Sequence, residues 1–389
     1  MKKCFLKMIT TILACALIFL SSSNILAATP TRAESDYLSN QSLYYAHEAL
    51  NLEISNPQSS YYCYEPSAIE YGNPIPAYYY SNNIYEEEST VLIPIFFDDV
   101  LCLIAHVFYR HGEFTGVELT DDLVAELRQY DNMSIALVSQ ANSVFLYQEQ
   151  GRRVEVLKTY NYLTDIATVH TANSVQDYPL NSDYLSLVCS PLEKKFSFCQ
   201  LNSINSFEYI SAADPVNYLS TAPNSYNLGC TIVQQHGLPI CWAATVASIG
   251  LKLTGISRSA EYVSNYMLGE YDGGNTYLAA LALQQIYGLS TSDNYYAPYF
   301  SQIQTEIYDY NRPIYVRVCG TAGSHSDEIN HALFIDGYQV VSSGNLQGML
   351  SVADPNYSYF RSIYFTNDQV YPYSLGTRSG YIDEFILVS

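Results

Sequence analysis

The chain has 389 residues, of which 48% are apolar, and this is enough apolar material to build real folded cores. Its 38 acidic side chains outnumber its 17 Lys and Arg side chains, which gives a net charge of −21. Because no basic run is present to neutralise phosphates, nucleic acid and anionic membranes are disfavoured as partners.

Residues 1–28 are typical of a secretory signal peptide. Lysines come first, an apolar stretch runs from about Met8 to Leu20, and small residues lead up to Ala28. The apolar stretch is too short to span a bilayer comfortably, and no later segment reaches about 18 apolar residues. We therefore expect a secreted protein with no membrane anchor.

Residues 29–190 predict a small α+β region. Apolar residues in 36–55 recur at helical spacing, and a short helix is expected after Thr120 and its two aspartates. Alternating or apolar runs predict strands at 91–97, 100–109, 114–119, 133–139, 143–147 and 153–160. Four histidines in this region have no acid or cysteine at a useful spacing, so we expect surface or core residues: His47, His106, His111 and His170.

Residues 191–227 predict a linker. Ser, Asn, Pro and Tyr dominate the segment, and regular apolar periodicity is lost. Such a backbone is accessible to proteolysis, so the linker is the expected site of any maturation cut.

Residues 228–389 predict a second region with a helical half followed by a β half, so the fold class is α+β. Helices are expected at 240–253, 259–268 and 277–287. After Asn311 the chain reads as strands: PIYVRVC, HALFIDGYQV, GMLSVAD and RSIYF.

Cys241 is the candidate nucleophile. Of nine cysteines, Cys4 and Cys15 lie in the predicted signal peptide, which leaves an odd number and at least one free thiol. Pro239 presets the first turn of a helix that begins at Cys241. Unpaired N–H groups and the dipole at a helix start stabilise a thiolate, which is the nucleophilic form of cysteine.

A nucleophilic cysteine also needs a base and a donor for the oxyanion. Two histidines follow Cys241: His325 in a loop and His331 at the start of a strand. A strand gives the imidazole a fixed direction, so His331 is the stronger candidate. Gln235, six positions before Cys241, is placed to donate its amide N–H to the oxyanion together with the backbone N–H of Cys241.

His325 also raises the question of a metal site, because Asp327 and Glu328 lie near it. No second His or Cys stands at ligand spacing, and we therefore expect a solvated loop there. We expect neither a metal nor a cofactor.

The residues around the candidate cysteine and histidine carry a family resemblance. The matching features are Gln235 with Cys241-Trp242, the run Asn330-His331-Ala332, the pair Gly337-Tyr338 and the pair Asp354-Pro355. Together they resemble the papain-like cysteine peptidases over residues 228–389. Asp354-Pro355 is most similar to compact bacterial members, which include staphopain-like and bacteriocin-leader-processing peptidases, and the signal peptide would then be a bacterial one.

The third member of a catalytic triad follows from strand alternation. If HALFIDGYQV and GMLSVAD form a hairpin, His331 lies across from Asp354 or Asn356. Asp336 is an odd number of positions from His331 and points to the other face. The resemblance implies Asn in many members and Asp in compact bacterial ones, so Asp354 is expected to orient His331, with Asn356 as the alternative.

Three functions are consistent with these residues. The resemblance implies a secreted cysteine endopeptidase, made as a zymogen, which hydrolyses a protein or peptide substrate. Its N-terminal region would act as an intramolecular inhibitor or help the catalytic region fold. The alternatives are a transglutaminase-like thiol acyltransferase, which also uses Cys, His and Asp, and an inactive exported binding protein on a peptidase fold.

Overall fold

The computed structural model describes residues 32–57, 59, 61–62, 64–81, 84–87, 90–110, 112–130, 133–140, 143–148, 152–159, 163–164, 189–197, 222–320, 329–341 and 345–389. The predicted signal peptide, most of the predicted linker, His111, His170 and the loop with His325 lie outside these residues. Two compact units divide the chain, Met1–Gln41 and Ser42–Ser389. The candidate site and the elements that position it belong to the second unit.

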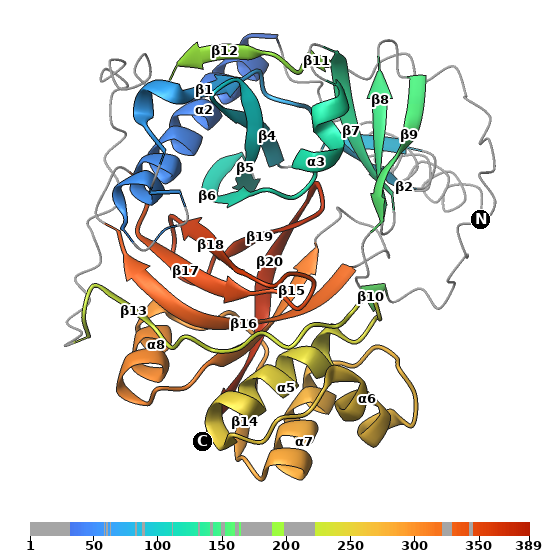
Figure 1. Cartoon of the computed structure of the whole chain (residues 1–389), viewed down its shortest axis with the longest axis vertical. Helices are drawn as coiled ribbons and strands as arrows, with labels where there is room; N and C mark the ends of the chain where they lie inside the picture. The colour runs from blue at the N-terminus through green and yellow to red at the C-terminus, as the bar shows by residue number, and fades with distance from the viewer. Residues whose placement is uncertain are drawn as a thin grey trace, which may run out of the picture. The chain divides into compact units, whose positions relative to one another are not determined.

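The fold is mixed α+β, as expected (Figure 1). The α-helices are α2 (Arg32–Ser55), α3 (Val124–Leu127), α5 (Cys241–Thr254), α6 (Ala260–Leu268), α7 (Thr276–Tyr287) and α8 (Phe300–Gln304). Short 3-10 turns lie at Pro66–Ala68 and Arg128–Tyr130, and a π-helical turn, Thr305–Asp309, continues α8. Within the described ranges, no helix combines the length and the apolar character needed to cross a membrane.

A large antiparallel sheet dominates the fold. Its strands, in spatial order, are β12 (Lys194–Ser197), β1 (Ile69–Gly72), β4 (Thr90–Phe97), β5 (Val100–Arg110), β6 (Glu113–Thr120), β18 (Phe360–Phe365), β17 (Gly348–Ala353), β16 (Ile329–Val340), β15 (Ile314–Gly320), β20 (Arg378–Val388) and β14 (Thr291–Asn294). Three short strands join it: β10 (Leu163–Thr164) and β13 (Ser225–Asn227) pair with β16, and β19 (Pro372–Leu375) pairs with β20.

A second, smaller sheet is formed entirely by strands that precede residue 192. It consists of β3 (Ile84–Glu87), β2 (Ala77–Ser81), β7 (Ser134–Gln140), β8 (Ser143–Gln148) and β9 (Arg152–Thr159), with β11 (Ser190–Pro191) beside β7. The strands predicted at 133–139, 143–147 and 153–160 are therefore found within about two residues of their expected bounds.

The large sheet runs without a break from the N-terminal region into the C-terminal region. Its junction is the antiparallel pair of β6 and β18, in which Gly116 faces Phe365 and Glu118 faces Ile363 (Figure 1). Gly116 permits this pairing, because an added Cβ there would lie 2.1 Å from the carbonyl oxygen of Tyr364. Backbone hydrogen bonds therefore tie residues before the predicted linker to residues after it.

Helices α5, α6 and α7 form the helical half, on the side of β16 away from β6 (Figure 1). Each begins within one residue of the bound that the sequence predicts. Ser259 caps α6 by accepting a hydrogen bond from Tyr262 N, and Asn275 caps α7 by accepting one from Leu278 N. The apolar faces of α5 and α7 join the main core, where α5 packs on β15 and β16 and α7 packs on β14 and β20.

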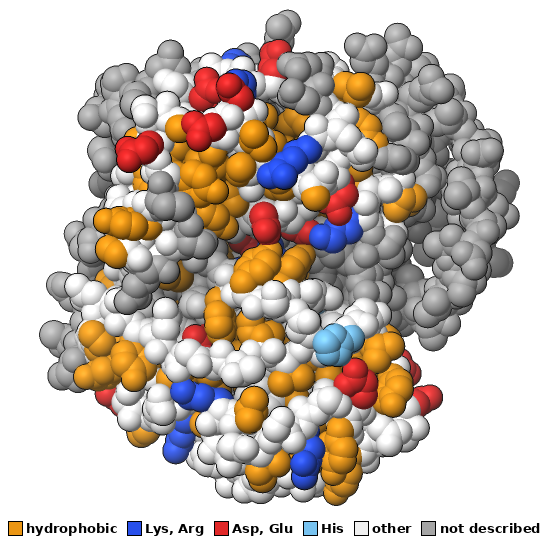
Figure 2. Space-filling view, viewed as in Figure 1, with side chains coloured by type: hydrophobic (Ala, Val, Ile, Leu, Met, Phe, Trp, Pro, Cys, Tyr) orange, Lys and Arg blue, Asp and Glu red, His pale blue; other side chains and the backbone are white. Residues whose placement is uncertain are grey.

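The surface in Figure 2 shows Lys and Arg side chains lying singly or in small groups among acidic and apolar ones. Exposed tyrosines are frequent on the helical half and the segments that follow it: Tyr262, Tyr266, Tyr271, Tyr277, Tyr295, Tyr296, Tyr299, Tyr308 and Tyr310. These hydroxyls supply polar surface in a chain with few lysines.

Candidate active site

Cys241 is the first residue of α5, and its side chain is fully buried. The helix begins after Ile240, whose carbonyl oxygen accepts hydrogen bonds from Ala243 N and Ala244 N at 3.0 Å. The N–H groups of Cys241 and Trp242, which come before these bonds, have no intrahelical acceptor, so they face any charge that develops at this end. The expected placement of Cys241 at a helix start is therefore found.

Trp242 anchors this helix start. Its indole Nε1 donates a hydrogen bond of 2.9 Å to the carbonyl oxygen of Asp272, in the segment that leads to α7. The ring is fully buried and packs against Gly274, where an added Cβ would come within 2.6 Å of it. The only tryptophan of the chain thus fixes the helix that carries Cys241.

His331 lies in β16, opposite Val318 of β15, and is 1% exposed. Its Nε2 is 2.7 Å from Asp354 Oδ1. Burial by itself lowers the pKa of His331, but the charge of Asp354, the hydrogen bond to it and a hydrogen bond with Cys241 raise the pKa to about 10. The imidazolium form is therefore favoured beside the thiol of Cys241.

Asp354 follows the last residue of β17 and is fully buried. Its Oδ1 accepts a hydrogen bond of 2.8 Å from Asn356 N, and its Oδ2 accepts one from Tyr373 OH. Burial by itself raises the pKa of Asp354, but His331, Arg361 and Tyr373 together hold it below its usual value. Several donors therefore hold the Asp354 carboxylate in place and stabilise its charge.

Asn356, the alternative partner, is also close to the imidazole. Its Nδ2 lies 3.3 Å from His331 Nε2, farther than the carboxylate oxygen of Asp354. Both residues that strand alternation selected therefore reach His331, and Asp354 makes the shorter contact with the opposite charge.

Asp336 does not approach the imidazole. A bulge lies between Ile335 and Gly337, and the Asp336 carboxylate accepts hydrogen bonds from Gly229 N at 3.3 Å and Cys230 N at 2.8 Å. Its role in the structure is to hold the segment that leads toward α5.

Gln235 lies in the turn that precedes α5, and its side chain is fully buried. Its backbone N donates a hydrogen bond of 3.1 Å to the carbonyl oxygen of Pro355, and its own carbonyl accepts one from Leu238 N. His236 and Gly237 have φ values of +50° and +76°, which reverse the chain toward the helix. The turn that carries Gln235 is thus tied to the residue after Asp354.

The candidate site is closed in this structure. Cys241, His331 and Gln235 are each at most 1% exposed. Next to His331, β10 pairs with the start of β16: Leu163 faces Asn330 and Thr164 faces Ile329. A segment from the N-terminal region therefore occupies the strand edge immediately before the imidazole.

Three residues at the site were not singled out from the sequence: Glu118, Arg361 and Tyr373. Arg361 left one signal, since it is a charged residue at the start of an apolar strand. Glu118 and Tyr373 left none, because only the pairing of distant strands brings them to Asp354. Among the residues that the structure describes, no group of three or more His, Cys, Asp or Glu side chains is arranged to hold a metal ion.

Comparison of the chain with protein-family models and with curated protein sequences gives no match. The chemistry of the site therefore has to follow from its own geometry. That geometry joins a thiol at a helix start, a buried imidazole and a carboxylate, which together suit acyl transfer through a covalent thioester.

Proposed function

We propose that this protein is a papain-like cysteine endopeptidase. Cys241 is the nucleophile, His331 the general acid and base, Asp354 the residue that orients His331, and Gln235 an oxyanion donor. The observation that carries the proposal is the arrangement of His331, whose Nε2 is 2.7 Å from Asp354 and whose pKa is raised by that carboxylate and by the nearby thiol at the start of α5. The resemblance to compact bacterial members of the family supports the same assignment.

The proposed reaction begins with attack of the Cys241 thiolate on the carbonyl carbon of a peptide bond. The negative charge on the carbonyl oxygen is stabilised by the backbone N–H of Cys241 and the side-chain amide of Gln235. The His331 imidazolium donates its proton to the leaving amine, and a thioester remains. A water molecule then gives a proton to His331, attacks the thioester carbon and releases the carboxylic acid and the thiolate.

Asp354 supports both steps. Its charge stabilises the imidazolium, and its hydrogen bond holds the ring so that Nδ1 rather than Nε2 is directed at the reacting atoms. A buried carboxylate suits this role because the surrounding low-dielectric region strengthens its interaction with His331.

The N-terminal region is proposed to restrain the enzyme as a zymogen. Pairing of Leu163 and Thr164 with β16 blocks an edge at which an extended peptide would otherwise add as a strand. Two residues make a weak pairing by themselves, so β10 depends on the chain connections at both of its ends. A cut within 191–227, after export, would break the link between the N-terminal region, which carries β10, and the region that carries Cys241, so that this weak pairing opens more readily.

Product analysis separates this function from the two alternatives. Incubation with a reduced, unfolded protein should release new peptide termini, whereas a transglutaminase-like enzyme would incorporate an added primary amine instead. An epoxide thiol probe should label Cys241 in the linker-cleaved protein. Absence of both labelling and turnover would indicate an inactive binding protein, and amine incorporation without new termini would indicate the acyltransferase.

A further inference from the structure

A buried ion pair joins the N-terminal region to the candidate triad. Arg361 Nη2 of β18 lies 2.6 Å from Glu118 Oε1 of β6, and both side chains are at most 2% exposed. Ser374 binds both partners: its hydroxyl accepts from Arg361 Nη2 and its backbone N donates to Glu118 Oε2. Burial raises the pKa of Glu118 above its usual value, and the charge of Arg361 and the hydrogen bonds from Ser374 oppose that rise.

The same guanidinium reaches the back of Asp354. Arg361 Nη1 is 3.8 Å from Asp354 Oδ2 and donates a hydrogen bond of 2.7 Å to Tyr373 OH. The Tyr373 hydroxyl in turn donates to Asp354 Oδ2. A continuous chain of contacts therefore runs from His331 through Asp354 and Arg361 to Glu118.

Two cations, His331 and Arg361, compete for the Asp354 carboxylate. Asp354 has two positively charged neighbours, His331 and Arg361, and the Glu118 carboxylate pairs with Arg361. Without the Glu118 charge, Arg361 would be a buried cation whose nearest carboxylate is Asp354. Asp354 would then be shared, and its support of the imidazolium would weaken.

We propose that Glu118 is a positioning residue for the triad, because it neutralises Arg361 and so leaves Asp354 to His331. The N-terminal region, in addition to any inhibitory role, thereby supplies part of the active site. This role rests on the proposed function, since it concerns the acid and base strength of His331 in that reaction.

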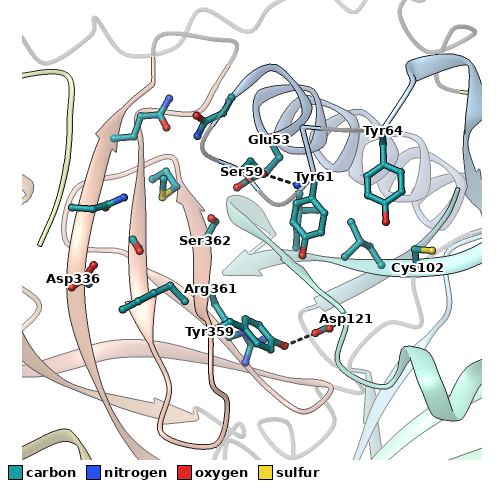
Figure 3. Close-up of a pocket in the computed structure, with 18 of the residues that line it drawn as sticks. Glu53, Ser59, Tyr61, Tyr64, Cys102, Asp121, Asp336, Tyr359, Arg361 and Ser362 are labelled. Carbon is teal, nitrogen blue, oxygen red and sulfur yellow. Dashed lines mark hydrogen bonds between the residues drawn. The ribbon is translucent and has the colours of Figure 1, made fainter. Parts of the chain in front are cut away.

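The surroundings of Arg361 are well defined. A cavity of about 1080 Å³ borders it on one side, and Figure 3 shows Tyr359 reaching from the start of β18 to Asp121, just beyond β6. His106 faces Glu118 on the neighbouring strand β5. The titratable groups close to the pair or to Asp354 are His106, His331, Tyr357, Tyr359 and Tyr373; Asp122 lies near His106, and Cys241 near His331.

The test is an NMR titration of the full chain labelled with ¹⁵N-histidine, in which His331→Gln identifies the His331 signals. Glu118→Gln should lower the pKa of His331 by about 0.5 unit or more, and Arg361→Gln should raise it. The double variant E118Q/R361Q removes one charge of each sign and should return the pKa close to the wild-type value. The alkaline limb of kcat/KM for unfolded casein should move with the NMR value in each variant.

The matched control is Glu53→Gln. Glu53 is a buried carboxylate of the N-terminal region that accepts a hydrogen bond of 2.8 Å from Tyr364 OH of the same strand β18. Tyr364 points to the opposite face of β18 from Arg361, so this variant should leave the His331 titration unchanged.

The NMR titration tests the role of Glu118 even if the protein shows no casein hydrolysis. Shifts of opposite sign that cancel in the double variant support the role of Glu118. A folded Glu118→Gln protein with an unchanged His331 pKa would overturn it, and so would an unchanged pKa in Arg361→Gln if Glu118→Gln does not fold. Absence of casein hydrolysis by the linker-cleaved wild-type protein would instead count against the proposed function alone.

Discussion

Thr245 Oγ1 donates a hydrogen bond of 3.2 Å to the carbonyl oxygen of Ala332. The bond joins α5 to β16 one helical turn beyond Cys241 and one residue beyond His331. It therefore sets the distance between the candidate nucleophile and its base, although neither residue takes part in the chemistry.

Thr245→Val keeps the volume of the side chain and removes this bond. We expect kcat to fall by about threefold to tenfold with little change in KM, because a small shift of α5 misplaces the thiol but leaves substrate contacts intact. Thr254→Val is the control, since Thr254 bonds to Gly250 within the same helix. Equal losses in the two variants, measured by steady-state hydrolysis of casein, would contradict a specific role for Thr245.

Asp354→Ala should reduce turnover by about tenfold to a thousandfold, less than loss of Cys241 or His331, because it removes orientation and charge but leaves the nucleophile and base. Asn356→Ala should cost less, since Asn356 is a neutral partner at 3.3 Å. Steady-state kinetics of both variants checks the order. A larger loss in Asn356→Ala would transfer the orienting role to Asn356.

His106 should make the protein sensitive to acid. Burial, and to a lesser degree Arg361, lower the pKa of His106 to about 3, below the usual 6.5 of the unfolded chain. Between about pH 6.5 and pH 3 the unfolded chain binds a proton that the folded state does not. The contribution of this side chain to the free energy of unfolding therefore falls by about 1.4 kcal/mol for each pH unit of acidification.

The variant His106→Leu tests this dependence. Neither ring nitrogen of His106 has a hydrogen-bond partner among the described residues, so an apolar replacement of similar size should fold normally at neutral pH. Urea unfolding at several pH values should show wild type losing stability relative to the variant as the pH falls below about 6.5. Parallel stability curves for the two proteins would show that His106 is not held neutral in the folded state.

Cleavage of the segment 191–227 should raise kcat/KM several-fold, because that segment no longer links β10 to the region that carries Cys241, and the two-residue pairing of β10 with β16 opens more readily. The N-terminal part should nevertheless remain bound through the pairing of β6 with β18. Size-exclusion chromatography with mass spectrometry of a specifically nicked protein measures both effects. Activity equal to that of the uncut chain would remove the inhibitory role, and separation of the two parts would show that the sheet junction does not hold them.

Much of the C-terminal architecture follows from local sequence signals. The Pro239 lead-in, the capping residues Ser259 and Asn275, and long apolar periodicities mark α5 to α7 closely. Alternation in two adjacent strands was also enough to select Asp354 and Asn356 as neighbours of His331. These predictions depend on residues close together in the chain or on one hairpin.

Features that depend on distant segments were not predictable. The pairing of β6 with β18, and with it the contact between Glu118 and Arg361, leaves no periodic signal in either strand. Helix α8 was also missed, because it is short and its start is fixed by a distant contact, Phe300 N with Asp368 Oδ1 at 2.7 Å. Single-sequence patterns do not report such tertiary contacts.

The most direct test of the central claim is mass spectrometry of a reduced, unfolded protein incubated with the linker-cleaved chain, beside its Cys241→Ala and Cys230→Ser variants. Burial, with Asp336 nearby, raises the pKa of the Cys230 thiol, so that thiol stays protonated and should be dispensable. We predict new peptide termini with the wild-type and Cys230→Ser proteins and none with Cys241→Ala. Unchanged cleavage by the Cys241→Ala protein would contradict the assignment of Cys241 as nucleophile and, with it, the proposed function.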